Sequence, residues 1–242
     1  MRALIIDDER LARKELNSLL EDSNEITVVG EAVNADDAYQ KILELKPDLL
    51  FLDIQMPGKT GFDLLEMLDA VPHVIFTTAY DEYALQAFDV NALDYLLKPI
   101  QKERLLESIN KLASKNIDAQ PDSKENPEAF KLGVDDQVFV KDGERCWFVR
   151  LSEVRLFESE GNYIKVYFDG NRPMIHKSLN ALDEKLDDRS FFRASRKHII
   201  NLSWIEKIEP WFNGGLMVVL KGGQNVEVSR RQAARFKEMM SL

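Results

Sequence analysis

Five short apolar runs alternate with stretches of helical period in the first half of the chain, and this alternation limits the possible folds more than any other feature. The runs occupy residues 3–7, 26–31, 48–53, 73–78 and 92–97. Between them, apolar residues recur three or four positions apart, as at Ala12, Leu16 and Leu19. Strands that alternate with helices over short connections predict a parallel sheet covered by helices on both faces. We therefore predict an α/β domain over residues 1–114.

The second half of the chain has a different pattern. Short strand-like runs follow one another, separated by turn signals such as Asp169-Gly170 and Gly222-Gly223. Only residues 178–186 and 230–240 have a helical pattern, so we predict a mostly β domain over residues 131–242. The stretch from Ser114 to Glu128 has a single large apolar residue and two prolines, which predicts a linker, assigned to residues 115–130.

The charge of the chain is divided unevenly between the two predicted domains. The formal net charge is -10, but residues 1–114 hold 11 Lys and Arg against 22 Asp and Glu, a net of -11. Residues 131–242 hold 19 against 16, a net of +3. An acidic half joined to a basic half directs the search for a polyanionic partner to the second domain.

Several protein classes are disfavoured by composition. The single cysteine, Cys146, excludes an internal disulfide and disfavours a cysteine-based zinc site. The first ten residues contain three acidic side chains, unlike a signal peptide, and no apolar segment approaches the roughly 18 residues that span a bilayer. We therefore expect a cytoplasmic protein.

Polar side chains stand at the carboxyl ends of the predicted parallel strands, where such sheets bind ligands. Carboxylates that converge there repel one another unless they bind a divalent cation, and an all-oxygen set suits Mg²⁺. Asp53, which directly follows a buried run, is then placed as a nucleophile for phosphoryl transfer, with a lysine and a hydroxyl to neutralise the incoming charge. The side chains at these strand ends are Asp7, Asp8, Asp53, Thr77, Thr78 and Lys98.

Each of these residues also has an ordinary explanation. Asp8 could cap a helix that begins at Glu9, Thr78 could simply end a strand, and Lys98 could be a solvated charge. Taken singly these explanations are favoured. Taken together they do not account for separate strand ends that supply one coherent site.

Residues 1 to about 114 resemble the receiver domain of two-component response regulators. The motifs are Asp7-Asp8, Asp53 followed by Met56-Pro57-Gly58 and Gly61, Thr78-Ala79, and Tyr95 three residues before Lys98-Pro99. The resemblance implies a flavodoxin-like (βα)5 fold and Mg²⁺ bound by Asp8, Asp53 and the backbone carbonyl of Gln55, with Asp7 nearby. It also implies a cis Lys98–Pro99 bond and a sensor histidine kinase that phosphorylates Asp53.

Phosphorylation is expected to act as a conformational switch. When Thr78 moves toward the phosphoryl oxygens it vacates space that Tyr95 can fill, which shifts a balance between two existing conformations. The alternative for Tyr95 is a half-buried aromatic at a strand edge. The switch alters a surface of mixed charge that suits a homodimer, and its residues are Glu82, Gln86, Asp89, Lys102 and Arg104.

Positive charge in the second domain is clustered. Residues 189–201 contain four Lys or Arg and no acid, and Arg230-Arg231 open the last predicted helix. Such side chains can contact phosphates and base edges, although a charge run is also common on a solvated face. No helix-turn-helix or zinc-finger spacing is present, so loops or strands would have to enter the groove.

Four segments of the second half resemble the LytTR-type DNA-binding domain, over residues 131 to 242. They run from Phe157 to Tyr163, from Lys177 to Leu179, from Phe192 to Asn201 and from Val228 to Arg231. The family implies loops that enter successive major grooves of direct-repeat DNA. The implied base contacts are Asn162, Tyr163, Arg196 and Arg231; the implied phosphate contacts are Lys177, Ser178, Arg193, Lys197 and Arg230. Ser195 replaces a frequent histidine, so its part in base reading is open, and His198 is expected to pack or face solvent.

The whole chain is similar to regulators of the LytR/AlgR class, including those of BtsR type, which pair with membrane sensor histidine kinases of the LytS or BtsS type. We therefore expect a transcription factor, dimeric on activation, and no enzymatic turnover. One alternative is a phosphatase of the haloacid-dehalogenase type, but that class needs an acid two residues after the nucleophile, where this chain has Gln55. Another is an output domain that binds RNA or only other proteins.

Overall fold

The computed structural model describes residues 1–21, 23, 25–79, 94–115, 131–143 and 145–240. The chain divides into two compact units. The first comprises Met1–Asn126 with Gly143–Phe148, and the second comprises Pro127–Asp142 with Val149–Leu242. The domain limits drawn from the sequence, at residues 114 and 131, stay predictions.

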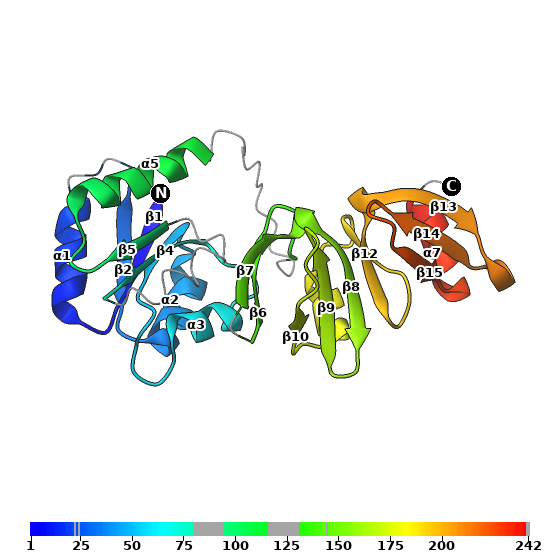
Figure 1. Ribbon diagram of the computed structural model, residues 1–242, viewed down its shortest axis with the longest axis horizontal. Helices are drawn as coiled ribbons and strands as arrows, with labels where there is room; N and C mark the ends of the chain where they lie inside the picture. The colour runs from blue at the N-terminus through cyan, green and yellow to red at the C-terminus, as the bar shows by residue number, and fades with distance from the viewer. Residues whose placement is uncertain (22, 24, 80–93, 116–130, 144, 241–242) are drawn as a thin grey trace. The chain divides into compact units, whose positions relative to one another are not determined.

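The first unit is built on a five-stranded parallel sheet in the order β2-β1-β3-β4-β5, which confirms the predicted α/β flavodoxin-like class. Figure 1 shows α1 and α5 on one side of this sheet and α2 and α3 on the other. The strands are β1 (Arg2–Ile6), β2 (Thr27–Ala32), β3 (Leu49–Leu52), β4 (His73–Thr78) and β5 (Asp94–Leu97). The helices are α1 (Arg10–Glu21), α2 (Ala35–Leu45), α3 (Gly61–Met67) and α5 (Lys102–Lys115).

Both faces of this sheet are buried, which explains why its strands are continuous apolar runs. On one face Ile5 and Phe51 pack against Leu16 of α1 and Leu105 of α5. The four residues of β3 are fully buried. The sheet is therefore held rigidly from both sides, and its strand ends are fixed points from which side chains can project.

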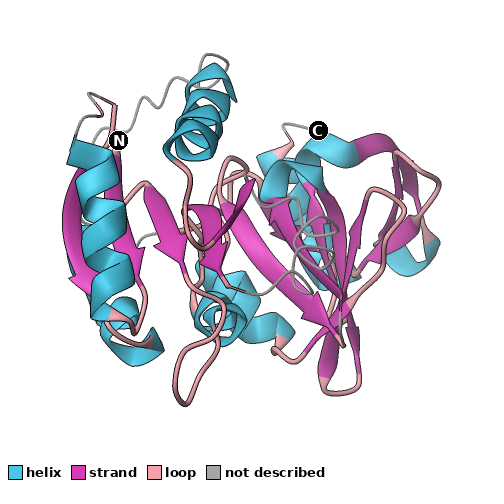
Figure 2. Ribbon diagram, turned by 60° about the vertical axis from the view of Figure 1, so that its left-hand side comes forward, coloured by secondary structure: helices cyan, strands magenta, loops and turns pink. Residues whose placement is uncertain are grey.

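The second unit consists mainly of antiparallel strands, drawn in magenta in Figure 2. One sheet has the order β10-β9-β8-β12-β11, and a second has the order β13-β14-β15. The first contains β8 (Val154–Glu160), β9 (Tyr163–Phe168), β10 (Met174–Ile175), β11 (Phe191–Arg193) and β12 (His198–Asn201); the second contains β13 (Ile205–Pro210), β14 (Leu216–Leu220) and β15 (Asn225–Val228). The helices of this unit are α6 (Leu179–Lys185) and α7 (Arg230–Met239). A separate two-stranded sheet consists of β6 (Gln137–Asp142) and β7 (Arg145–Arg150).

Local chemistry accounts for the hairpins of this unit. Asp169 and Gly170 both have positive φ, 38° and 78°, as a tight two-residue hairpin turn requires, and Asn171 N donates to Phe168 O at 2.6 Å. The two sheets and α7 share one apolar core, in which Phe192 of β11 and Phe236 of α7 have ring centroids 4.9 Å apart. The mostly β domain with two short helices is confirmed. Among the residues that the structure describes, no helix is long and apolar enough to cross a membrane.

Candidate functional site

The sheet of the first unit brings three carboxylates together. Ile6 and Leu52 are register partners in β1 and β3, so the residues that follow them, Asp7 and Asp53, lie at the same level. Asp53 N donates to Ile6 O at 2.8 Å, which ties the two strand ends together. One carboxylate oxygen each from Asp7, Asp8 and Asp53 lies within 4.8 Å of the others. Asp7 and Asp53 are buried and Asp8 is exposed, so the cluster opens to solvent on one side.

Lys98 lies across two of these carboxylates. It follows β5, and its Nζ lies 2.7 Å from Asp7 Oδ2 and 2.6 Å from Asp53 Oδ2. Its backbone N donates to Thr78 O at 2.9 Å, and the Lys98–Pro99 bond is cis, as the resemblance implied. The half-buried ammonium and the two buried carboxylates thus form one electrostatic unit.

The ionisation of this unit follows from burial and from the pairing. Burial raises the pKa of Asp53 above its ordinary value and the neighbouring Asp7 adds to this, while Lys98 opposes it. Burial disfavours the charged form of Lys98, but hydrogen bonds and attraction to Asp53 and Asp7 outweigh it and raise the Lys98 pKa. The charged form of Asp53 is therefore disfavoured mainly by burial, and an added cation would offset that cost.

The loop after Asp53 has little freedom. Asp53 Oδ1 accepts from Gln55 N at 3.1 Å, and Gly61 N donates to Ile54 O at 2.8 Å. A Cβ on Gly61 would lie 2.5 Å from the Asp53 carbonyl oxygen, so only glycine allows this approach. Thr60 and Asp63 form a capping box that starts α3. The backbone on both sides of Asp53 is thereby fixed.

Arg13 is part of this site and was not predicted from the sequence. It is buried on α1, and its Nη1 donates to the backbone oxygens of Asp7 at 2.8 Å and Asp8 at 3.2 Å. Its Nε pairs with Glu31 Oε2 at 2.9 Å. Arg13 therefore holds the strand end that carries two of the three carboxylates. The available signal was its position three residues before Leu16, on the apolar side of the helix.

The predicted switch residues are near this site. Thr78 ends β4 and is fully buried, and its hydroxyl has no hydrogen-bond partner among the described residues. Tyr95 is half-buried on β5, where Phe76 is its register partner. On the predicted dimer surface, Arg104 binds Asp94 at 3.0 Å and Glu107 at 2.8 Å. Lys102 begins α5, whereas Glu82, Gln86 and Asp89 lie outside the described residues.

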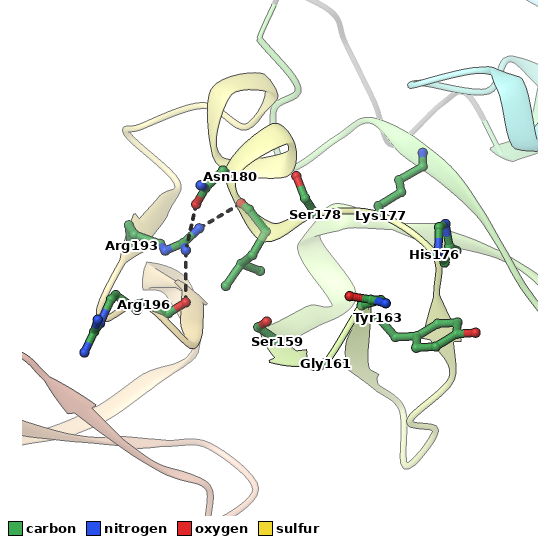
Figure 3. Close-up of a pocket in the computed structure, with 11 residues that line it drawn as sticks. Ser159, Gly161, Tyr163, His176, Lys177, Ser178, Asn180, Arg193 and Arg196 are labelled. Carbon is green, nitrogen blue, oxygen red and sulfur yellow. Dashed lines mark hydrogen bonds between the residues drawn. The ribbon is translucent and has the colours of Figure 1, made fainter.

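In the second unit, a pocket of about 590 Å³ gathers six of the ten predicted DNA contacts. Figure 3 shows that its walls come from the β8–β9 turn, from the segment before α6 and from the residues after β11. Tyr163 is 45% exposed at the start of β9 and packs edge-on against His176, with ring centroids 5.4 Å apart. The six residues are Asn162, Tyr163, Lys177, Ser178, Arg193 and Arg196.

Arg193 is largely engaged within the protein. Its guanidinium donates to the backbone oxygens of Ser195 at 2.7 Å, Leu179 at 2.8 Å and Arg196 at 3.0 Å, and to Asn180 Oδ1 at 3.1 Å. Four of its five N–H groups are thus used. Figure 3 shows the bonds to Asn180 and to Arg196 among these, and it shows the Arg196 side chain pointing outward from them. Arg193 shapes the loop, whereas Arg196 is presented by it.

The remaining predicted contacts border this loop. Ser195 Oγ accepts from Lys197 N at 3.2 Å and lies 3.2 Å from Nδ1 of His198. Ser178 is the N-cap of α6 and accepts from Ala181 N at 3.1 Å. The backbone N of Ser229 donates to Ala194 O at 3.0 Å, which fastens the start of α7 to the loop. Lys197 and the two residues that begin α7, Arg230 and Arg231, have exposed side chains.

Comparison with known proteins agrees with both halves of this description. Residues 3–110 match the response regulator receiver domain, and residues 144–241 match the LytTr DNA-binding domain. Sensory transduction protein LytT of Enterococcus faecalis is 36% identical over the full length of both chains. A response regulatory protein of Vibrio cholerae is 38% identical, with 99% of this chain and 98% of that one covered. The response regulatory domain of protein mrkE from Klebsiella pneumoniae is 33% identical over 48% of this chain and 97% of its own, with a TM-score of 0.44.

The chain combines a parallel α/β domain that carries a carboxylate cluster with a mostly β domain whose predicted DNA contacts include exposed Arg and Lys side chains. The chain belongs to the two-component response regulators that carry a receiver domain and a LytTR DNA-binding domain. It therefore acts in transcription regulation within a two-component system.

Proposed function

We propose that a sensor histidine kinase phosphorylates Asp53, and that this event controls dimerisation and binding of direct-repeat promoter DNA. The observation that carries the proposal is the Asp53 carboxylate, buried within 4.8 Å of oxygens of Asp7 and Asp8 and 2.6 Å from Lys98 Nζ. In the transfer, an Asp53 oxygen forms a bond to phosphorus as the bond from phosphorus to the kinase histidine nitrogen breaks. Neither water nor a second acid is needed as a reactant in this step.

The carboxylate cluster fits a hard divalent ion, because its oxygens converge and are only partly neutralised by Lys98. Asp8, Asp53 and the carbonyl of Gln55 would hold Mg²⁺, with Asp7 close by. When bound, Mg²⁺ neutralises charge that develops on the phosphoryl oxygens. Lys98 would turn from its carboxylates to a phosphoryl oxygen and keep it paired.

The switch is proposed to begin at Thr78. Its buried hydroxyl lacks a hydrogen-bond partner among the described residues, and such a group gains free energy when a phosphoryl oxygen becomes available as an acceptor. Movement of Thr78 would free space for Tyr95. Dimerisation then joins two DNA-binding domains, which together bind paired half-sites more tightly than one domain does.

The test of the output is a footprint on DNA from a randomised duplex pool, with and without beryllofluoride and Mg²⁺. The proposal predicts a protected direct repeat that strengthens with beryllofluoride in the wild type and not in Asp53→Asn. Protection of a single half-site, or equal protection in both proteins, would contradict it. A parallel assay for phosphate release from small phosphomonoesters tests the phosphatase alternative, for which steady turnover is required.

A further inference from the structure

Four polar side chains form a continuous chain that leads from the core of the second unit to the loop that presents Arg196. Tyr167 Oη donates to Glu158 Oε2 at 2.5 Å. Glu158 Oε1 lies 3.5 Å from His198 Nε2, and His198 Nδ1 lies 3.2 Å from Ser195 Oγ. The members come from β9, β8, β12 and the loop before β12.

The inner end of the chain is fixed and the outer end is attached to the loop. Tyr167 is 8% exposed and belongs to the core that contains Phe236. His198 and Glu158 face each other as register partners on β12 and β8. At the outer end, Ser195 Oγ accepts the backbone N–H of Lys197. A change of orientation at His198 is therefore passed directly to the loop.

The protonation states determine which side chain donates and which accepts at each of these contacts. Burial lowers the pKa of His198, only partly opposed by Glu158, so the ring is neutral at neutral pH. Burial and the bond to Glu158 raise the pKa of Tyr167 to about 12, so its hydroxyl keeps its proton. Burial works against ionisation of Glu158, but Tyr167 and His198 outweigh it and lower its pKa. An ionised Glu158 only accepts, so His198 donates from Nε2, its Nδ1 accepts, and the Ser195 hydroxyl donates.

We propose that Glu158, His198 and Ser195 are positioning residues that set the conformation of the Ser195–Lys197 loop, and through it the base specificity of Arg196. This rests on the proposed DNA binding. It assigns Ser195 a different part from a base contact, because its donor and one of its two acceptor sites are already used within the protein. Specificity is the quantity affected, since base readout depends on side-chain placement whereas phosphate contacts depend mainly on charge.

An NMR test determines which of these side chains donate and which accept hydrogen bonds. Long-range ¹H–¹⁵N spectra of the full protein, assigned with His198→Asn, should show His198 protonated at Nε2 and bare at Nδ1 at neutral pH. In Glu158→Gln the amide can accept from Tyr167 and donate to Nε2, so the ring should change to the Nδ1-protonated tautomer. An Nδ1-protonated ring in the wild type, or an unchanged tautomer in Glu158→Gln, would overturn the proposal.

A binding test measures how these side chains affect the base specificity of DNA binding. The probes are a short duplex carrying the sequence that the wild type selects from a randomised pool, and a random-sequence duplex of equal length. Ser195→Ala and Glu158→Gln should each lower the ratio of the two affinities about fivefold to tenfold, the scale of one lost hydrogen bond. Random-duplex affinity should stay constant, and Ser195→Thr should restore the ratio. Ser152→Ala is the matched control, because Ser152 is half-buried in the same unit and its backbone makes hydrogen bonds to Val134 and Trp204.

The outcomes separate this inference from the proposed function. A wild type that does not distinguish the duplexes contradicts the DNA-reading function itself. A wild type that distinguishes them, with an unchanged ratio in Glu158→Gln, contradicts the positioning role alone. If the affinity ratio falls in Ser195→Ala but not in Glu158→Gln, Ser195 contacts a base directly, and this outcome also overturns the proposal.

A pH profile gives a further readout. Glu158 faces His198 from β8, and Tyr167 of β9 binds Glu158, while Arg193 and Lys197 act on His198 from its own hairpin. Protonated His198 donates from both nitrogens, so the Ser195 hydroxyl must reverse. The ratio of selected-duplex to random-duplex affinity should therefore fall as the pH drops through the lowered His198 pKa. A ratio that does not depend on pH would contradict the proposed role of these side chains.

Discussion

Lys98 Nζ lies 2.6 Å from Asp53 Oδ2 and simultaneously 2.7 Å from Asp7 Oδ2, so one ammonium pairs with two buried carboxylates. Lys98 follows β5, whereas the two aspartates follow β3 and β1. Three strand ends are thus connected by a single side chain. With Asp8 at the open side, the unit still carries an excess of negative charge, which favours the binding of a cation here.

Loss of Lys98 tests this pairing. Lys98→Ala leaves two buried carboxylates without their partner and should lower the free energy of unfolding of the receiver by roughly 3–5 kcal/mol. Lys59→Ala, which breaks an exposed pair with Asp36, should cost at most about 1 kcal/mol. Urea unfolding followed by circular dichroism measures both. Equal effects of the two substitutions would mean that the buried pairing contributes no more than a surface one.

Replacement of Asp53 should stabilise the receiver in the absence of Mg²⁺. The pKa of Asp53 is raised in the folded state, so its charged form is disfavoured there and the penalty is fully present above the folded pKa. Asp53→Asn removes that penalty and should raise the free energy of unfolding by about 0.5–2 kcal/mol at neutral pH. The gain should shrink as the pH falls toward the ordinary Asp value of 3.8.

Mg²⁺ should reverse that difference. The ion should bind the folded wild type and stabilise it by mass action, whereas Asp53→Asn lacks one carboxylate of the cluster. Thermal unfolding over a Mg²⁺ titration measures both proteins in parallel. If Mg²⁺ raises the thermal stability of Asp53→Asn as much as that of the wild type, the ion does not bind at Asp53.

Arg13 should matter for the same site through the backbone. Arg13→Gln removes the donors that hold the carbonyls of Asp7 and Asp8, and should cost about 1.5–3 kcal/mol of stability. It should also weaken Mg²⁺ binding, because the strand end can then shift. Arg10→Gln is the control, since Arg10 is exposed on the same helix. Mg²⁺ affinity that is equal in the two variants would limit Arg13 to a role in folding.

The importance of Arg13 shows where sequence reasoning stops. The strands could be predicted because burial on both faces leaves continuous apolar runs, and β4 spans the predicted residues 73–78. Asp7, Asp8, Asp53 and Lys98 could be predicted to meet because parallel strands end at one edge. The role of Arg13 in the site could not, because the partners through which it acts there are the backbone carbonyls of Asp7 and Asp8, which leave no mark on side-chain patterns. The same holds for Arg193, whose bonds join segments 14 residues apart.

Two neighbouring cations of the DNA-binding domain should behave differently. Arg196→Ala should cost about 1–3 kcal/mol on the selected duplex and relax preference at one base position. Lys197→Ala should weaken binding to all duplexes alike and reduce the salt slope by about one. Lys237→Ala, an exposed lysine on α7, is the control for loss of charge. Fluorescence anisotropy over a salt series measures all three, and equal loss on selected and random duplexes for Arg196→Ala would remove it from base readout.

The most direct test of the central claim is mass spectrometry of the full chain after incubation with acetyl phosphate and Mg²⁺. The account predicts that one phosphoryl group is added to the wild type, that peptide mapping places it on Asp53, and that Asp53→Asn and a sample with a chelator gain nothing. An unmodified wild-type chain, or a phosphoryl group that persists in Asp53→Asn, would contradict the claim that this carboxylate is the acceptor.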